Sequence, residues 1–167
     1  MANPEQLEYL QDSADDWNIY RREHAITRPD LSGADLSAAE LPGADLSGAN
    51  LTRADLRAID LTGSNLANAD LSGANLSGAF LLNVVLNGAN LSGADLTGAN
   101  LTGVNATNTN LTNATLTGAT LTGANLTNAD LTNAMLYQAD LSGANLTNAT
   151  LLQADLSGAV GFNSSGT

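Results

Sequence analysis

The chain carries few of the side chains that perform catalysis or bind metals tightly. It has one histidine, His24, which follows Glu23, and it has no cysteine among its 167 residues. A lone histidine does not build a convincing Ser-His-Asp arrangement, and the lack of cysteine excludes disulfides, thiolate metal sites and cysteine nucleophiles. The glycines recur at fixed places in a short repeat, which indicates turns and not a phosphate-binding loop. The sequence therefore predicts neither an enzyme nor a bound cofactor.

Carboxylates are the remaining groups that could do chemistry, because rows of them could bind a metal ion. Every twentieth position groups them with asparagines in columns: Asp30, Asn50, Asp70 and Asn90 in one, and Asp35, Asp55, Asn75 and Asp95 in the next. Ca²⁺ requires about six to eight oxygens that converge on one point, and side chains that project in parallel from a flat wall do not converge. We therefore expect no metal site, but a solvated face whose asparagines hydrogen-bond along each column.

These residues belong to a repeat that must position them. From Leu31 to Leu156 every fifth position is leucine, and among these 26 positions only Ala106 differs. A period of five matches neither the 3.6 residues of a helical turn nor the two-residue alternation of a strand. A short repeat at a fixed interval indicates a stacked coil, in which each unit buries its apolar face against its neighbours.

Each unit of the repeat reads Ala-Asp/Asn-Leu-Ser/Thr-Gly/Asn. Residues 34–37 (Ala-Asp-Leu-Ser) and 124–128 (Ala-Asn-Leu-Thr-Asn) match the A(D/N)LXX motif, so the chain resembles the pentapeptide-repeat family over about four-fifths of its length. The resemblance implies an all-β fold, a right-handed quadrilateral parallel β-helix (solenoid) with four units in each square coil. The segment with Trp17 and Arg21 is also similar to the one that often precedes such repeats.

The residues of the unit account for such a coil independently. Alanine and leucine are two residues apart, so on an extended segment both point inward, while the residues between and after them point outward. The fifth position is Gly or Asn in 21 of 26 units, and these residues tolerate the positive φ that the third position of a type II turn requires. The exceptions are Ala38, Arg53, Ala58, Gln138 and Gln153. Sorted by their remainder on division by 20, they fall in two of four columns, which favours four sides over three.

The chain divides into three zones. Residues 1–29 are expected to form an N-terminal helical cap, residues 30–159 the β-helix, and residues 160–167 a disordered C-terminal tail. Because the last coil has no comparable cap, its edge is a candidate for an end-to-end homodimer.

Within the cap, one amphipathic helix is expected over residues 3–24. Asn3 is its expected N-cap, Pro4 suits the first helical position, and Gln6 is expected to reach back in a capping box. Leu7, Leu10, Ala14 and Trp17 recur at spacings of three and four and form one apolar stripe.

Composition excludes several classes of partner. Five arginines and no lysine stand against 17 acidic residues, and the net charge of −12 repels phosphate backbones. We therefore expect no direct nucleic-acid binding.

No apolar run approaches the ~20 residues of a membrane span, and the first residues lack the basic start and apolar stretch of a secretory signal. We expect a cytoplasmic protein with no membrane contact, although a trimmed export signal stays open.

Outward positions that break the polar pattern are the candidate functional residues. Large apolar residues occupy six of them: Phe80, Leu82, Val85, Met135, Tyr137 and Leu152. Exposed apolar residues in a polar wall can mark a contact with another protein, although neutral drift or cover by the chain's own tail would also account for them. We predict a non-enzymatic structural or interaction protein that presents a rigid surface to an unidentified protein partner.

The alternative function is an acidic mimic of DNA that inhibits a type II topoisomerase, a role that the resemblance implies for some proteins of this kind. Duplex DNA carries evenly spaced charge, about one per 1.7 Å. In the repeat, seven of the 11 acids lie between Asp30 and Asp70, and no charge occurs from residue 96 to residue 129. This uneven distribution favours the interaction protein over the mimic.

Overall fold

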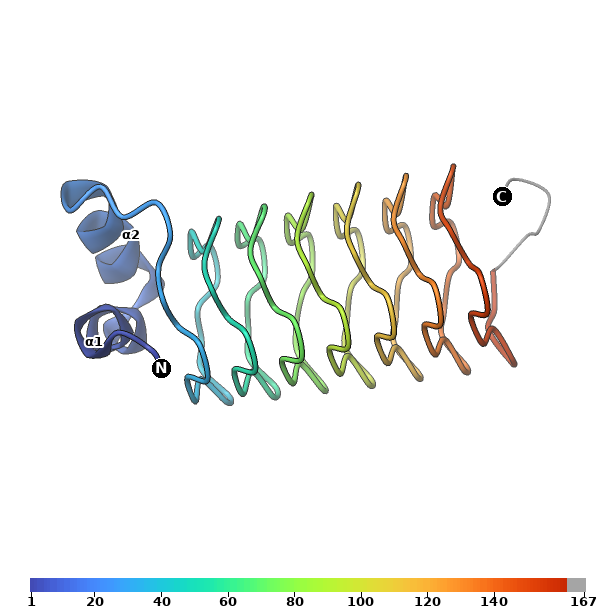
Figure 1. Ribbon diagram of the computed structural model, residues 1–167, viewed down its shortest axis with the longest axis horizontal. Helices are drawn as coiled ribbons and strands as arrows, with labels where there is room; N and C mark the ends of the chain where they lie inside the picture. Colours follow the sequence, from blue (N-terminus) through green and yellow to red (C-terminus); the bar gives the residue numbers. More distant parts are fainter. Residues whose placement is uncertain (162–167) are drawn as a thin grey trace.

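The N-terminal cap consists of two short helices, and the first begins at the asparagine and proline that the sequence predicts for a helix start. The computed structural model describes residues 1–161; helix α1 spans Pro4–Asp12 and helix α2 spans Ala14–Glu23 (Figure 1). The Oδ1 of Asn3 accepts hydrogen bonds from the N–H groups of Glu5 (3.1 Å) and Gln6 (3.2 Å). The prediction that Asn3 is the N-cap is therefore confirmed.

The prediction of one helix over residues 3–24 is wrong, because the chain leaves helical geometry at Ser13. Ser13 is extended (φ −170°, ψ 162°). Its Oγ accepts from the N–H of Asp16 at 3.0 Å and donates to Asp16 Oδ2 at 2.7 Å, which caps the second helix. Leu10 and Trp17 are fully buried, so the apolar stripe persists across the break.

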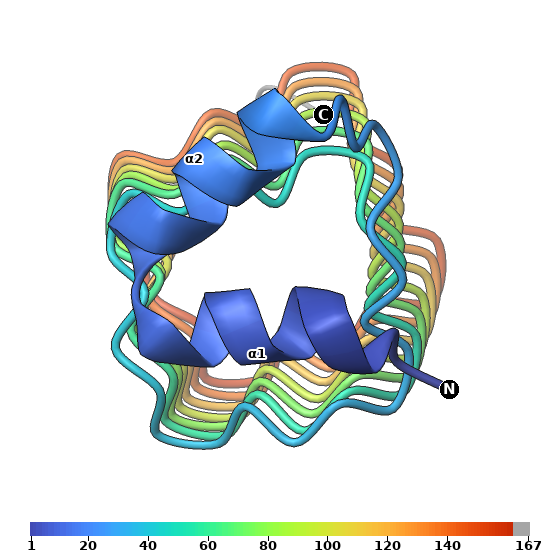
Figure 2. The same cartoon turned by 90° about the vertical axis from the view of Figure 1, so that its left-hand side faces the viewer.

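Gln6 does not complete a capping box, and that prediction is also wrong. Its Oε1 accepts from the N–H of Asp30 at 2.9 Å, and the N–H of Asn3 donates to the Asp30 carbonyl at 2.7 Å. The start of α1 is thus joined to the first unit of the repeat. Figure 2 shows both helices lying across the open end of the first coil, where Leu10 and Trp17 exclude water from the apolar interior.

The repeat forms four-sided coils that stack in parallel (Figures 1 and 2). Each bridge joins an outward residue to the one twenty positions later, from Asp30 with Asn50 to Asp140 with Val160. The predicted 20-residue coil is confirmed. The repeat runs one residue beyond its predicted end, because Val160 is part of a bridge. The rest of the predicted tail, residues 162–167, lies outside the described residues.

Backbone hydrogen bonds join each side of a coil to the next coil. The N–H groups of Leu36 and Ala38 donate to the carbonyls of Asp55 (2.9 Å) and Arg57 (2.8 Å), and the N–H of Asp55 donates back to Ala34 (2.9 Å). The bridging residues are isolated, so each strand is one residue long and the chain turns between strands.

Every unit ends in a tight turn whose third residue has positive φ. In the unit of Leu36, the Leu36 carbonyl accepts from the N–H of Ala39 at 3.2 Å, and the φ of Ala38 is 56°. The five residues that replace Gly or Asn adopt this conformation too, with φ between 53° and 58°: Ala38, Arg53, Ala58, Gln138 and Gln153. A residue with a Cβ is strained there by about 1–2 kcal/mol.

The interior is filled by stacked leucine and alanine side chains. The leucines at five-residue intervals from Leu31 to Leu141 are at most 3% exposed. Burying a leucine stabilises a fold by about 1.5–3 kcal/mol, which outweighs the poor strand propensity of alanine, asparagine and glycine. Ser64 and Thr109 replace inward alanines, and their hydroxyls donate to the carbonyls of Leu41 and Leu86 at 2.9 Å each.

Replacing Ala38 or Ala58 by glycine should stabilise the chain by about 0.5–1 kcal/mol, because the change removes a Cβ from a backbone with positive φ. The matched control is Gly78→Ala in the same column, where φ is +67° and a Cβ meets nothing within 4 Å. Urea denaturation followed by circular dichroism measures both. A lower midpoint for Ala38→Gly, or an unchanged one for Gly78→Ala, would contradict this interpretation of the turns.

Candidate functional site

The titratable residues within residues 1–161 do not gather into a reactive centre. His24 ends α2, where its Nδ1 lies 2.9 Å from the Tyr20 carbonyl and its ring lies 4.3 Å from the Tyr20 ring. This described part holds no group of three or more His, Cys, Asp or Glu placed to bind a metal ion. None of its helices is long and apolar enough to span a membrane.

The outward Asp and Asn side chains form hydrogen bonds with the backbone of their own unit. The Oδ1 of Asp30 accepts from the N–H of Ser32, two residues later, at 3.1 Å. All 19 Asp and Asn residues that precede a central leucine (or Ala106) make this bond, at 2.8–3.3 Å. This Asx bond satisfies an outward backbone donor that the bonds between coils do not use, so it explains why the repeat favours Asp or Asn there.

Part of the asparagine ladder expected along the columns is present. The Nδ2 of Asn50 donates to Asp30 Oδ1 at 3.2 Å, Asn90 donates to Asp70 at 3.0 Å, and Asn110 donates to Asn90 at 3.1 Å. An amide above a carboxylate therefore both caps its own turn and binds the coil before it. The columns stabilise the stack and bring no oxygens together around a central point.

Hydrogen bonds keep several of these carboxylates ionised. Donation by the Ser37 hydroxyl and N–H lowers the pKa of Asp35, and donation by the Arg57 side chain, whose Nη2 lies 2.6 Å from Oδ2, lowers the pKa of Asp55. A carboxyl with a lowered folded pKa stabilises the fold above its unfolded pKa, and this contribution is lost as the pH falls through the folded pKa. The carboxyl groups of Asp35 and Asp55 are therefore ionised at neutral pH.

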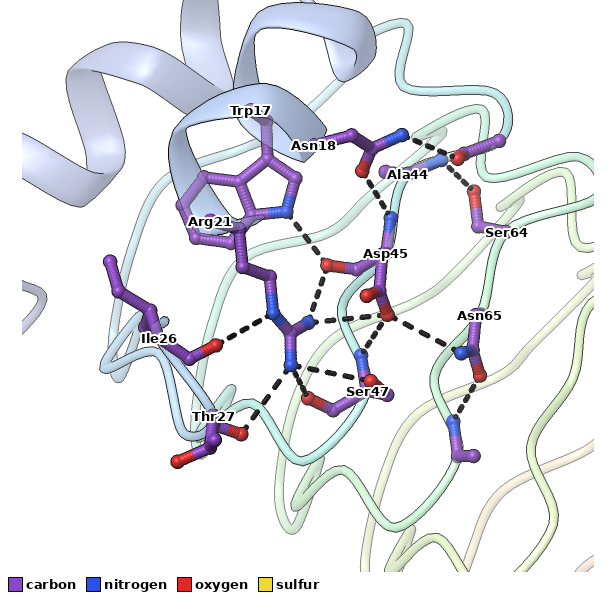
Figure 3. Close-up of polar contacts among 12 residues, drawn as sticks. Trp17, Asn18, Arg21, Ile26, Thr27, Ala44, Asp45, Ser47, Ser64 and Asn65 are labelled. Carbon is purple, nitrogen blue, oxygen red and sulfur yellow. Dashed lines mark hydrogen bonds and ion pairs between the residues drawn. The ribbon is translucent and has the colours of Figure 1, made fainter. Parts of the chain in front are cut away.

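A network around Arg21 joins the helices to the repeat (Figure 3). Arg21 is 8% exposed; its Nε donates to the Ile26 carbonyl at 2.9 Å, and its Nη1 donates to the Asp45 carbonyl at 2.6 Å and lies 3.3 Å from Asp45 Oδ1. The Trp17 indole also donates to the Asp45 carbonyl, at 2.8 Å, and Asn18 Oδ1 accepts from the Asp45 N–H at 2.7 Å. These side chains are occupied in holding the cap on the repeat.

The sequence places Arg21 in the segment before the repeat but does not predict that its side chain is buried. The spacing of apolar residues identifies the buried face of a helix but not a polar side chain that crosses its edge. Burial lowers the pKa of Arg21, and the nearby Asp45 opposes that shift.

The six apolar candidates lie in two clusters. The Phe80 cluster (Phe80, Leu82 and Val85) belongs to one coil, with Phe80 and Leu82 on one side and Val85 on the next. Phe80 is 53% exposed, whereas Leu82 and Val85, expected to face solvent, are half-buried by their neighbours.

The second group is the Met135 cluster. Met135 and Tyr137 share one side and are 46% and 45% exposed, and Leu152 follows in the next coil at 64%. Whether either cluster contacts a partner stays a prediction.

Both clusters interrupt the Asx bonds. Where Phe80 and Val85 replace Asp or Asn, the N–H groups of Leu82 and Asn87 have no acceptor within residues 1–161. The same holds for the N–H of Tyr137, because Met135 precedes it. Sequence reasoning found the apolar side chains but missed these free donors. The signal was present, since the acceptor two residues earlier can be read directly from the sequence.

A family model described as pentapeptide repeats matches the chain with eight copies, over residues 30–68, 64–103, 94–133 and 124–160. No match was found among curated proteins. Similar solved structures include a pentapeptide repeat protein from the Arabidopsis thaliana thylakoid lumen. It is 43% identical, the match covers 55% of this chain and 68% of that chain, and the TM-score is 0.48.

Two cyanobacterial structures are also similar. HetL, a pentapeptide repeat protein involved in heterocyst differentiation regulation from Nostoc sp. strain PCC 7120, is 38% identical over 78% of this chain and 73% of its own, with a TM-score of 0.29. The pentapeptide repeat protein Rfr23 from Cyanothece 51142 is 29% identical over 83% of this chain and 92% of its own, with a TM-score of 0.37.

Replacing Phe80 by asparagine should give a chain about 0.5–1.5 kcal/mol more stable than replacing it by alanine, because the new Oδ1 can accept from the Leu82 N–H. Phe80→Ala is the matched control, since both variants lose the same half-buried ring, which stabilises the wild type by about 0.7–1.5 kcal/mol. Urea denaturation compares the two variants. Equal stability of Phe80→Asn and Phe80→Ala would contradict the role of the Asx bond at this position.

Proposed function

The chain belongs to the pentapeptide-repeat family, and we propose that it is a non-enzymatic interaction protein that presents a rigid β-helical surface to a protein partner. Members of this family are generally non-enzymatic structural or interaction proteins. We also infer from this membership that the coil is right-handed. The observation that carries the proposal is the pair of exposed apolar clusters in an otherwise polar wall.

The clusters are unfavourable for an isolated rod. An Asp or Asn at position 80 or 135 would satisfy the backbone donor two residues later, as 19 such residues do elsewhere in the repeat. Phe80 and Met135 instead expose about half of an apolar side chain and leave that donor without an acceptor in the described part of the chain. Both features become favourable when a partner covers the side chain and accepts the hydrogen bond.

The DNA-mimic alternative is less well supported. Of the carboxylates in the acidic first coils, Asp45 is paired with Arg21 and Asp55 with Arg57, which leaves fewer unpaired charges than the sequence suggests. Inhibition of gyrase supercoiling at low micromolar protein, lost when Asp35, Asp55 and Asp60 are neutralised, would favour the mimic over the interaction protein.

The cytoplasmic location expected from the sequence stays a prediction.

A second copy of the chain is one proposed partner. Leu146, Leu151 and Leu156 in the last coil are partly exposed, unlike the leucines of the preceding coils. End-to-end pairing through this coil would bury them. Sedimentation equilibrium of concentrated protein should then detect a dimer that Leu151→Asp weakens, and a strict monomer at every concentration would refute the pairing.

Proteins captured from a native lysate of the source organism by the full chain should depend on one of the two clusters. Phe80→Asn/Leu82→Thr and Met135→Asn/Tyr137→Thr each restore residue types that the repeat uses at those positions, so both variants should remain folded. Quantitative mass spectrometry should show captured proteins depleted at least about fivefold by one variant and not by the other. An identical set of captured proteins for the wild type and both variants would contradict the proposed interaction surface.

A further inference from the structure

The Phe80 cluster adjoins an acidic strip on the same side of the rod. This third side contains Leu41, Leu61 and Leu81 at its centre, and its outward residues Glu40, Asp60 and Phe80 follow one another in successive coils. The Met135 cluster has a shorter acidic neighbour, because Thr115 precedes Met135 in its column and Asp155 alone follows it. The Phe80 cluster is therefore the one that adjoins two successive acids.

The acids of this strip have no basic partner within the described residues. The ion pairs there involve Asp45 and Asp55, which lie on other sides. Asp60 uses its Oδ1 to accept from the N–H of Thr62 at 2.8 Å, and Glu40 makes no side-chain hydrogen bond with the described residues. One Asp60 oxygen and the whole Glu40 carboxylate are thus available to a ligand.

The strip continues into a shallow open groove at the helical cap. The groove lies between the start of α2 and the first coil and is lined by Ser13, Ala14, Asp15, Glu40 and Pro42. From the groove to the Phe80 cluster, one face of the rod therefore passes from acidic to apolar. Coils stack at about 4.8 Å, so Glu40 and Phe80, two coils apart, are separated by about 10 Å along the rod.

The apolar end of the strip also offers backbone donors. The N–H of Leu82 on this side, and that of Asn87 on the next side, are without an acceptor among residues 1–161, as described above. A partner that only covers Phe80 would leave these donors buried and unsatisfied, which is unfavourable. A suitable occupant therefore brings carbonyl oxygens together with apolar and basic side chains, and an extended polypeptide has all three.

We propose that the third side binds an extended segment of another protein, in which a lysine or arginine lies two or three positions from a large apolar residue. The apolar residue packs on Phe80 and Leu82, and the basic residue pairs with Asp60 or Glu40. The spacing follows from the geometry: an extended chain rises about 3.3 Å per residue, so two or three residues span the distance from Phe80 to these acids. This inference rests on the proposed interaction function and names its ligand chemistry.

Random dodecapeptides displayed on phage and selected on the immobilised full chain test the proposal. The selected peptides should share a basic residue two or three positions from a large apolar one. A synthetic member of that group should bind the wild type in fluorescence polarisation. Phe80→Asn/Leu82→Thr should weaken binding about tenfold or more, and Glu40→Gln/Asp60→Asn about threefold or more.

Two features keep these variants interpretable. The Asp60→Asn change retains an Asx acceptor for the Thr62 N–H, so the acidic-strip variant changes charge without removing that bond. Met135→Asn/Tyr137→Thr removes similarly exposed apolar residues from another side and should change the affinity by less than about twofold.

Three results would overturn the proposal: no enriched peptide group, a group without basic residues, or binding that persists in Phe80→Asn/Leu82→Thr. A dimer lost in that variant would identify a second copy of the chain as the occupant and would also overturn it. Failure here is distinguishable from failure of the proposed function. Captured proteins that depend only on the Met135 cluster would sustain the interaction function while excluding this site.

Discussion

The structure depends on one constraint, the repetition of an inward leucine at every fifth position of a 20-residue coil. Each leucine lies over the leucine of the preceding coil, and the stack buries them almost completely from Leu31 to Leu141. The strands are single bridging residues with poor intrinsic propensity. Tertiary stacking therefore determines the backbone, and the local sequence has only to permit the turns. A shift by one residue would expose the whole interior, which makes the register strongly specified.

The same constraint determines the outer surface. Because inter-coil hydrogen bonds and the turn use the other backbone groups of a unit, one outward N–H per unit remains, and Asp or Asn two residues earlier accepts from it. The residue at an outward position therefore contributes to the hydrogen bonding of the coil, whether or not it also binds a partner. Thr115, Thr120 and Thr150 also lack this bond, but only Phe80 and Met135 combine its loss with an exposed large apolar side chain, and this combination identifies the candidate contact sites. The acidic character of the wall follows in part from the same requirement, since Asp and Asn both make this bond.

Most of the architecture could be predicted from the sequence because the repeat is so regular. The inward alanine and leucine, the positive φ at the fifth position and the four sides all follow from periodicity and residue type. The break at Ser13 was missed because the apolar stripe continues through it, although a serine followed three residues later by Asp16 indicated a second N-cap. The contacts of Gln6 and Arg21 depend on how the cap meets the first coil, which no local pattern specifies. The sequence shows that Phe80 stands two residues before Leu82. That this leaves the Leu82 N–H without an acceptor can be recognised only once the backbone geometry of the unit is known.

Amide hydrogen exchange on the isotopically labelled full chain tests this account most directly. The account predicts protection with a five-residue period, slowest at the central leucines and at the bridging residues between coils. It also predicts that the amides of Ser72 and Thr102 exchange more slowly than that of Leu82, because Asp70 and Asn100 accept from the first two. Protection without this period, or equal exchange at Leu82 and Thr102, would contradict the claim that stacked leucines and Asx bonds together define the coil.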